Sequence, residues 1–69
     1  MSQPQITVYG AHWCPDCRCS KQFLGEHQIP YNWVDIEQDR AGEAYVLLKN
    51  HGKRIIPTIE FADGSILVE

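Results

Sequence analysis

The pattern of apolar and polar residues along the chain predicts two strands and two helices in alternation. Two runs are rich in β-branched and aromatic residues, which is typical of strands, and two runs repeat apolar residues at helical spacing. In chain order these four elements cover residues 5–9, 15–27, 31–35 and 40–50. Because strands and helices alternate, we expect the first two strands to pair in parallel through a right-handed crossover.

Residues at the ends of the two helices support these boundaries. Pro30 breaks the first helix, and Asp39 is suited to cap the second. The spacing of apolar residues predicts that the first helix buries Phe23, Leu24 and part of residues 17–21. The apolar side of the second helix is expected to consist of Ala41, Ala44, Tyr45, Leu47 and Leu48.

The last third of the chain predicts a β-hairpin. Residues 53–61 lead into a third strand, Asp63-Gly64 is a strong signal for a tight turn, and residues 66–68 return antiparallel to the third strand. No linker or repeat interrupts the sequence, so residues 1–69 are expected to form a single domain. A core of this size usually supplies only about 3–5 kcal/mol of stability.

Composition and charge argue against several classes of function. The net charge is −3 and no stripe of Lys and Arg is present, which disfavours binding to a nucleic-acid backbone. The chain has no apolar run of about 18 residues to span a membrane, and residues 1–5 lack the features of a signal peptide. The three cysteines are odd in number and crowded within residues 14–19, unlike a secreted disulfide framework. We therefore expect a cytoplasmic protein.

The candidate chemistry lies in a Cys-x-x-Cys between the first strand and the first helix. Pro15 suits the first turn of a helix, so Cys14 falls at or just before the helix N-terminus, where the dipole favours an anion. A thiolate is such an anion, and it is the reactive form of cysteine. Cys17 follows one turn later on the same face. We predict that Cys14 is a nucleophile and Cys17 a resolving thiol; the alternative for each is an inert core cysteine.

Four further side chains surround this predicted dithiol. Asp16 places a carboxylate beside both sulfurs and should raise their pKa values, or it is a solvated acid that stabilises the helix dipole. Trp13 is expected to shield one flank of the site, with a core position as the alternative. His12 either supplies a charge or proton to the site or is a solvated loop residue. Cys19 is expected to be small and partly buried, with a third redox role as the alternative.

Metal binding is the main competing function. His12, Cys14, Cys17 and Cys19 offer four soft or borderline ligands within eight residues, and zinc takes four such ligands in a tetrahedron. Structural zinc sites usually draw ligand pairs from two separated segments, which a single helix start does not provide. An iron–sulfur cluster held through Cys14 is the second form of this alternative.

At these residues the chain resembles the glutaredoxin-like branch of the thioredoxin superfamily. The similarity covers nearly the whole chain. Within this branch, the chain looks closer to the small mycoredoxins and ribonucleotide-reductase-linked redoxins than to the archetypal glutaredoxins. The matching motifs are Thr7-Val8-Tyr9, Trp13-Cys14-Pro15-Asp16-Cys17, Val34-Asp35-Ile36, Ile56-Pro57-Thr58 and Asp63-Gly64. The resemblance implies an α/β, thioredoxin-like fold whose four-stranded mixed sheet has the order 2-1-3-4, with flanking helices. It implies a thiol–disulfide oxidoreductase that needs no cofactor. After this function and metal binding, the third alternative is a non-catalytic adaptor that has kept the fold.

The resemblance also implies how a substrate is bound. Pro57 corresponds to the family's cis-proline, which faces the dithiol, and the backbone of Ile56 would pair with an extended substrate segment. Ala11 stands where glutathione-using relatives have a lysine, and residues 67–68 are Leu-Val where those relatives have Gly-Gly. These departures weaken the case for glutathione and leave Arg54, with the neighbouring lysine, as a candidate anion contact or a solvated charge.

Partners and assembly follow from the same resemblance. The expected partner is a disulfide-containing protein, and the expected electron donor is a low-molecular-weight thiol or a thioredoxin reductase. Relatives ordinarily close with a helix after the last strand, and this C-terminal helix is not present in the sequence. We expect the sheet face beneath it to be bare unless a partner covers it. The chain is expected to be a monomer if the sequence is shortened, or a dimer through the exposed face if the chain truly ends at Glu69.

Overall fold

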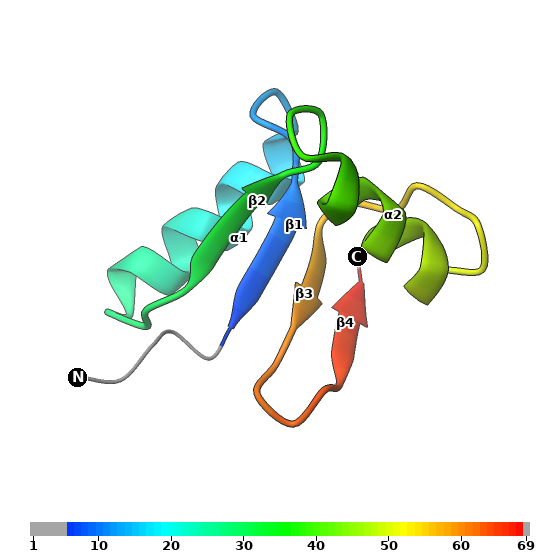
Figure 1. Cartoon of the computed structure of the whole chain (residues 1–69). Helices are drawn as coiled ribbons and strands as arrows, with labels where there is room; N and C mark the ends of the chain where they lie inside the picture. Colours follow the sequence, from blue (N-terminus) through cyan, green and yellow to red (C-terminus); the bar gives the residue numbers. More distant parts are fainter. Residues whose placement is uncertain (1–5, 69) are drawn as a thin grey trace.

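The computed structural model describes residues 6–68, and the expectations for residues 1–5 and for Glu69 lie outside this range. Within it, the chain forms all the predicted strands and helices in the predicted order (Figure 1). The elements are β1 (Thr7–Gly10), α1 (Pro15–Glu26), β2 (Asn32–Asp35), α2 (Arg40–Lys49), β3 (Thr58–Glu60) and β4 (Ile66–Val68). Their boundaries differ from the sequence prediction mainly at β3, which is shorter than the apolar run that contains it.

The four strands form one mixed sheet in the order β2-β1-β3-β4, which confirms the predicted fold class (Figure 1). β1 pairs in parallel with β2, and Tyr9 lies opposite Val34. On its other side β1 pairs antiparallel with β3, and Tyr9 lies opposite Thr58. The β3–β4 hairpin completes the sheet with Ile59 opposite Leu67. As a result, the C-terminal end of β1 lies beside the start of β3, which is where the candidate site is built.

The two helices cover opposite faces of the sheet, because successive residues of β1 point to opposite sides (Figure 1). On the α1 face, Val8, Leu24 and Ile59 form a buried cluster. On the α2 face, the ring of Tyr9 stacks on Tyr45 with centroids 4.8 Å apart. Partly buried apolar side chains extend the first cluster: Ile6, Ile29, Tyr31, Trp33 and Phe61.

Local hydrogen bonds fix the start of α2 and the end of α1. The Asp39 carboxylate accepts a hydrogen bond from Gly42 N at 3.1 Å, which confirms Asp39 as the N-cap of α2. Beyond the end of α1, Gln28 adopts a left-handed conformation with φ of 55°, and Ile29 N donates to Leu24 O at 2.8 Å. This hydrogen bond closes the last turn of α1, and Pro30 then directs the chain into β2.

The predicted buried face of α2 is wrong in its details. Gly42 and Val46 are the buried residues of this helix, whereas Ala41, Ala44 and Leu48 are exposed. A Cβ atom on Gly42 would come within 2.6 Å of Val34 Cγ1, so the helix lies close against β2 at this point. This close approach turns α2 so that Val46, rather than the larger Leu48, points to the sheet.

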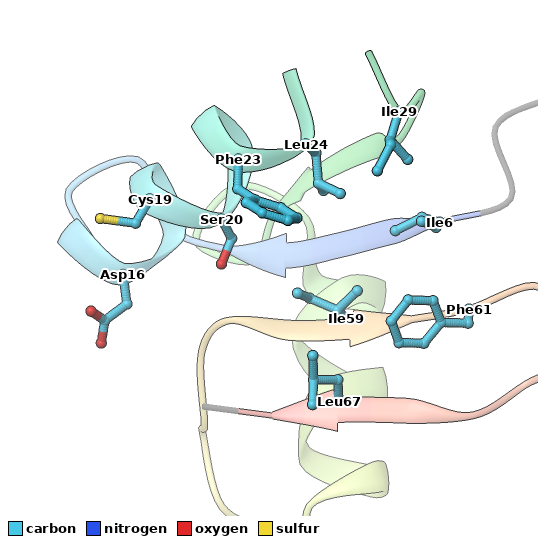
Figure 2. A pocket seen from close by; sticks show the side chains of 10 residues that line it. All are labelled: Ile6, Asp16, Cys19, Ser20, Phe23, Leu24, Ile29, Ile59, Phe61 and Leu67. Atoms are coloured by element: carbon cyan, nitrogen blue, oxygen red, sulfur yellow. The ribbon is translucent and has the colours of Figure 1, made fainter. Parts of the chain in front are cut away.

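The prediction for α1 is correct for Leu24 and Cys17, which are buried, and wrong for Phe23. The Phe23 side chain is 57% exposed and packs beside the His27 ring, with centroids 4.3 Å apart. Phe23 also borders an open apolar groove of about 490 Å³ between α1 and the sheet (Figure 2). Its lining residues are Ile6, Asp16, Cys19, Ser20, Phe23, Leu24, Ile29, Ile59, Phe61 and Leu67.

Among the described residues, neither helix is long and apolar enough to cross a membrane.

Candidate active site

Cys14 lies at the junction between the β1–α1 loop and the first turn of α1. It is the N-cap residue of the helix, with Pro15 at the first helical position, as predicted. Its own N–H donates to Ala11 O at 3.1 Å, which closes the loop, and its Sγ accepts a hydrogen bond from Cys17 N at 3.3 Å. The N–H group of Cys17 and the positive end of the helix dipole therefore both face the sulfur that we expect to be the nucleophile.

The two sulfurs of the Cys-x-x-Cys differ in exposure. Cys17 is completely buried, whereas Cys14 retains 6% of its accessible surface, and neither forms a disulfide. Both pack with Ala11 in a small apolar cluster. A substrate sulfur arriving from solvent can therefore reach Cys14 first, and it can reach Cys17 only through Cys14.

The environment of Cys17 keeps its sulfur protonated. Burial, followed by the neighbouring Cys14 and more weakly by the Asp16 carboxylate, raises the pKa of Cys17 to about 12. At neutral pH this residue is a thiol that must lose its proton before it can act as a nucleophile. The contribution of Asp16 has the sign that we expected for a carboxylate beside the dithiol.

Gly10 allows Cys17 to occupy this buried position. A Cβ atom at Gly10 would overlap Cys17 Sγ and would lie 3.0 Å from the Trp33 ring. The end of β1 therefore passes directly against the resolving sulfur, and only a residue without a side chain fits there. From the sequence, Gly10 could be recognised only as the residue that ends a strand.

Ile56 and Pro57 lie next to the dithiol because β3 begins beside the end of β1. Ile56 packs against the cluster formed by Ala11, Cys14 and Cys17. The Ile56–Pro57 peptide bond is cis, as the family resemblance implied. Thr58, the next residue, pairs with Tyr9 in the sheet. Cys14 and Ile56, which are 42 positions apart in the sequence, are thus brought into one site.

A buried polar contact between α2 and β3 supports this arrangement and was not predicted. Asn50 Nδ2 donates to Val46 O at 2.8 Å and to Thr58 Oγ1 at 3.2 Å. The Thr58 hydroxyl in turn donates to Ile55 O at 2.7 Å. Thr58 and Asn50 are both buried, so these hydrogen bonds fix the backbone on both sides of Pro57 to the end of α2.

The other predicted residues around the dithiol lie at the surface. Trp13 is largely exposed, so a core position for this residue is wrong. Cys19 is exposed rather than partly buried, because it lies on the outer side of α1 at one end of the groove (Figure 2). Asp16 is exposed as well. His12 is an exposed loop residue whose Nδ1 lies 3.3 Å from Asp35 Oδ2 at the end of β2.

Arg54, the predicted anion contact, is already paired with carboxylates of its own chain. Its Nε donates to Glu43 Oε2 at 3.1 Å, and its Nη2 lies 3.4 Å from Glu37 Oε2. These two ion pairs, and first of all the one with Glu43, raise the pKa of Arg54, so the guanidinium is charged throughout.

The candidate ligands for a metal do not converge. Among the described residues, no group of three or more His, Cys, Asp or Glu side chains is placed to hold an ion. Cys19 and His12 are exposed and lie on different segments, a helix and a loop, whereas Cys14 and Cys17 are buried. The zinc alternative therefore has no geometric support in this part of the chain.

Comparison with known proteins agrees with the geometry. The family profile described as glutaredoxin matches residues 6–66. A provisionally named glutaredoxin of Mycobacterium tuberculosis is 44% identical over 62 residues, which cover 90% of this chain and 74% of that protein. Mycoredoxin 1 of Corynebacterium glutamicum is 35% identical over 60 residues, which cover 87% of this chain and 73% of the relative.

Solved structures give the same result for the fold. The thioredoxin-like protein BC3987 superposes with a TM-score of 0.78 at 29% identity, covering 94% of this chain and 86% of that protein. A wheat glutaredoxin superposes with a TM-score of 0.75 at 17% identity, covering 99% of this chain and 64% of that protein. At this lower identity the second similarity supports the fold alone.

Proposed function

Because the chain belongs to the glutaredoxin family, we propose that it reduces protein disulfides, or mixed disulfides of proteins with small thiols, through Cys14 and Cys17. Members of the family are thiol–disulfide oxidoreductases, and this chain is one of them. The observation that carries the assignment to these two residues is the N–H of Cys17 aimed at Cys14 Sγ, in a pair of which only Cys14 keeps any accessible surface.

In the first step, the Cys14 thiolate attacks one sulfur of the substrate disulfide. A new S–S bond forms between Cys14 and that sulfur, while the substrate's own S–S bond breaks. The second substrate sulfur leaves with the electron pair as a thiolate and takes up a proton. The hydrogen bond from Cys17 N holds Cys14 Sγ at the helix start, where the attacking charge is stabilised before the bond forms.

In the second step, Cys17 resolves the mixed disulfide. Its thiol loses a proton, and the sulfur attacks Cys14 Sγ to form the Cys14–Cys17 disulfide. The bond between Cys14 and the substrate breaks, and the substrate sulfur that Cys14 had attacked leaves as a thiolate and is protonated. Two electrons and two protons have then passed from the dithiol to the substrate. Once Cys14 is bonded to the substrate it carries no charge, so one cause of the raised pKa of Cys17 is removed.

The substrate segment is proposed to lie along residues 55–57, next to the dithiol. Ile56 contacts the Cys14–Cys17 cluster, so a peptide that pairs with the Ile56 backbone as an added strand would present its own sulfur to Cys14. The electron donor is then a low-molecular-weight thiol or a thioredoxin reductase, which returns the disulfide to the dithiol. We place this cycle in the cytoplasm, where such donors maintain reducing conditions.

Serine substitutions at the three cysteines test the proposal. In a mixed-disulfide or insulin reduction assay, Cys14→Ser should abolish activity. Cys17→Ser should accumulate a covalent adduct between Cys14 and the substrate, detectable by mass spectrometry. Cys19→Ser is the matched control and should retain nearly full activity, because this thiol is exposed on the outer side of α1. Full activity of Cys14→Ser would refute the mechanism.

A further inference from the structure

The Trp33 side chain contacts both buried clusters on the α1 face of the sheet. It packs against the cluster that contains Val8 and also against the cluster that contains Cys14 and Cys17. In the parallel pair of β1 and β2, Trp33 lies opposite Val8, two residues before the end of β1. Its ring therefore extends along the sheet to reach the second cluster, and it forms one wall of the dithiol site.

The far edge of this indole lies near the Cys17 sulfur. A Cβ atom on Gly10 would overlap Cys17 Sγ and would lie 3.0 Å from Trp33 Cη2, so the sulfur and this ring carbon border the same small space at the end of β1. Cη2 is the outermost carbon of the indole, and a leucine side chain at the same position would end well short of it. The full length of the tryptophan is therefore needed to close this side of the resolving sulfur.

Lys21 holds the ring from the helix side. Its Nζ lies 3.8 Å from the centroid of the Trp33 ring, which is a cation–π contact. Lys21 follows Cys17 by four residues in α1, so the two side chains share one face of the helix, one turn apart. Both members of the contact are partly buried, and such contacts are stronger when they are shielded from water. One turn of α1 thus carries the resolving sulfur and the cation that fixes the ring beside it.

We propose that Trp33, held in place by Lys21, is a positioning residue for the resolving step, because its ring keeps the Cys17 sulfur turned towards Cys14. This inference rests on the proposed function and deepens it. The hydrogen bond from Cys17 N to Cys14 Sγ at 3.3 Å sets the backbone of the pair, but the rotamer of Cys17 decides where its own sulfur points. With a void in place of the ring, the sulfur could turn into that space and would be aligned for attack less often.

The reaction affected is the attack of Cys17 on the mixed disulfide. The Cys17 thiol loses its proton, its sulfur forms a bond to Cys14 Sγ, and the bond between Cys14 and the substrate breaks. The substrate sulfur leaves with the electron pair and takes up a proton. The earlier attack of Cys14 on the substrate does not involve the Cys17 sulfur, so Trp33 and Lys21 should affect the second step and not the first.

The aromatic disulfide DTNB separates the two steps, because it releases one coloured thiolate in each. Attack by Cys14 gives a first phase whose rate depends on the reagent concentration, and resolution by Cys17 gives a second phase whose rate does not. Both phases are followed by stopped-flow absorbance with the reduced protein. All measurements use the Cys19→Ser background, so that the exposed third thiol does not contribute.

Substitutions at Trp33 and Lys21 should change the second phase alone. Trp33→Leu should slow it on the order of tenfold, as expected for a misaligned attacking atom, and leave the first phase nearly unchanged. Lys21→Met keeps an aliphatic chain over the ring but loses the charge, and it should slow the second phase about twofold to fivefold. Lys21→Arg should restore the wild-type rate, because a guanidinium also binds the face of an indole.

Two controls separate positioning from a general loss of packing. Tyr31 is a partly buried aromatic residue that packs on the Val8 cluster and, among the described residues, is not one of those packed on the dithiol cluster. Tyr31→Leu should therefore lower the stability to urea without slowing the second phase. The double variant Lys21→Met/Trp33→Leu should be no slower than Trp33→Leu alone, because Lys21 acts through the ring.

The possible results distinguish this inference from the proposed function. An unchanged second phase in Trp33→Leu, equal slowing in Tyr31→Leu, or additive slowing in the double variant would overturn the inference while leaving the proposed function intact. If the protein with wild-type Trp33 and Lys21 releases only one coloured thiolate per chain, Cys17 does not resolve the mixed disulfide and the proposed function itself fails.

Discussion

Replacement of Gly10 by alanine should damage both stability and the resolving step. The added Cβ would overlap Cys17 Sγ and crowd Trp33, so either the buried sulfur or the end of β1 must shift. Insertion of one methyl group into a packed core typically costs about 1–3 kcal/mol. Because a domain of this size has only about 3–5 kcal/mol of stability, the change removes a large fraction of the total. Urea denaturation followed by Trp fluorescence should show the loss.

The same displacement should move Cys17 away from Cys14, because Gly10 lies directly against its sulfur. We therefore expect Gly10→Ala to accumulate the mixed disulfide while Cys14 still reacts with substrate. Gly25→Ala is the matched control: it is an exposed glycine of α1, and within the described residues a Cβ there meets no atom inside 4 Å. It should stabilise the protein by about 0.5–1 kcal/mol, because alanine is the better helix former. Wild-type stability together with normal resolution in Gly10→Ala would refute the packing argument.

Three further predictions follow from individual contacts. The pKa of Cys17 is raised from an ordinary value near 9 to about 12, so the stability that it contributes should be complete below pH 9 and fall with rising pH toward 12, by about 1.4 kcal/mol per pH unit. Urea denaturation at several pH values between 9 and 11 should show this slope, and Cys17→Ala should lack it. Asp39→Ala should cost about 1 kcal/mol by removing the cap of α2, measured by urea denaturation, whereas Asp39→Asn should retain most of it. Asn50→Ala should cost about 1–3 kcal/mol and raise the KM for a protein disulfide, because the backbone around Pro57 loses its anchor to α2; equal stability of variant and wild type would contradict this role.

The strands and helices could be predicted because they depend on local signals. The β-branched run before Gly10, the proline after Cys14 and the capping Asp39 each act within a few residues of themselves. The position of Cys14 at the start of α1 is likewise a local property, and the structure confirms it. The sheet order needed the family resemblance, because local signals alone do not say on which side of β1 the hairpin pairs.

The contacts that could not be predicted join distant parts of the chain. Gly42 lies so close to Val34 that α2 turns its valine inward, and no spacing rule within the helix contains that information. The Asn50–Thr58 hydrogen bond and the ion pair of Arg54 with Glu43 both depend on how α2 docks on the sheet. Each of these residues has an ordinary local explanation, as a helix end, a strand residue or a surface charge. Only the tertiary arrangement distinguishes them.

The different roles of the two sulfurs follow from one turn of helix and one missing side chain. Cys14 precedes the first turn of α1, so its sulfur accepts a hydrogen bond from the backbone N–H of Cys17, and the residue keeps 6% of its accessible surface. Cys17 is one turn further along, and at that position α1 descends onto the end of β1, where Gly10 leaves room for a sulfur and little else. The small remaining exposure and the hydrogen bond to sulfur therefore coincide on Cys14, whereas complete burial and a raised pKa coincide on Cys17. A substrate that bonds to Cys14 is held where Cys17 can displace it, whereas the reverse order of attack would require the buried sulfur to reach solvent first.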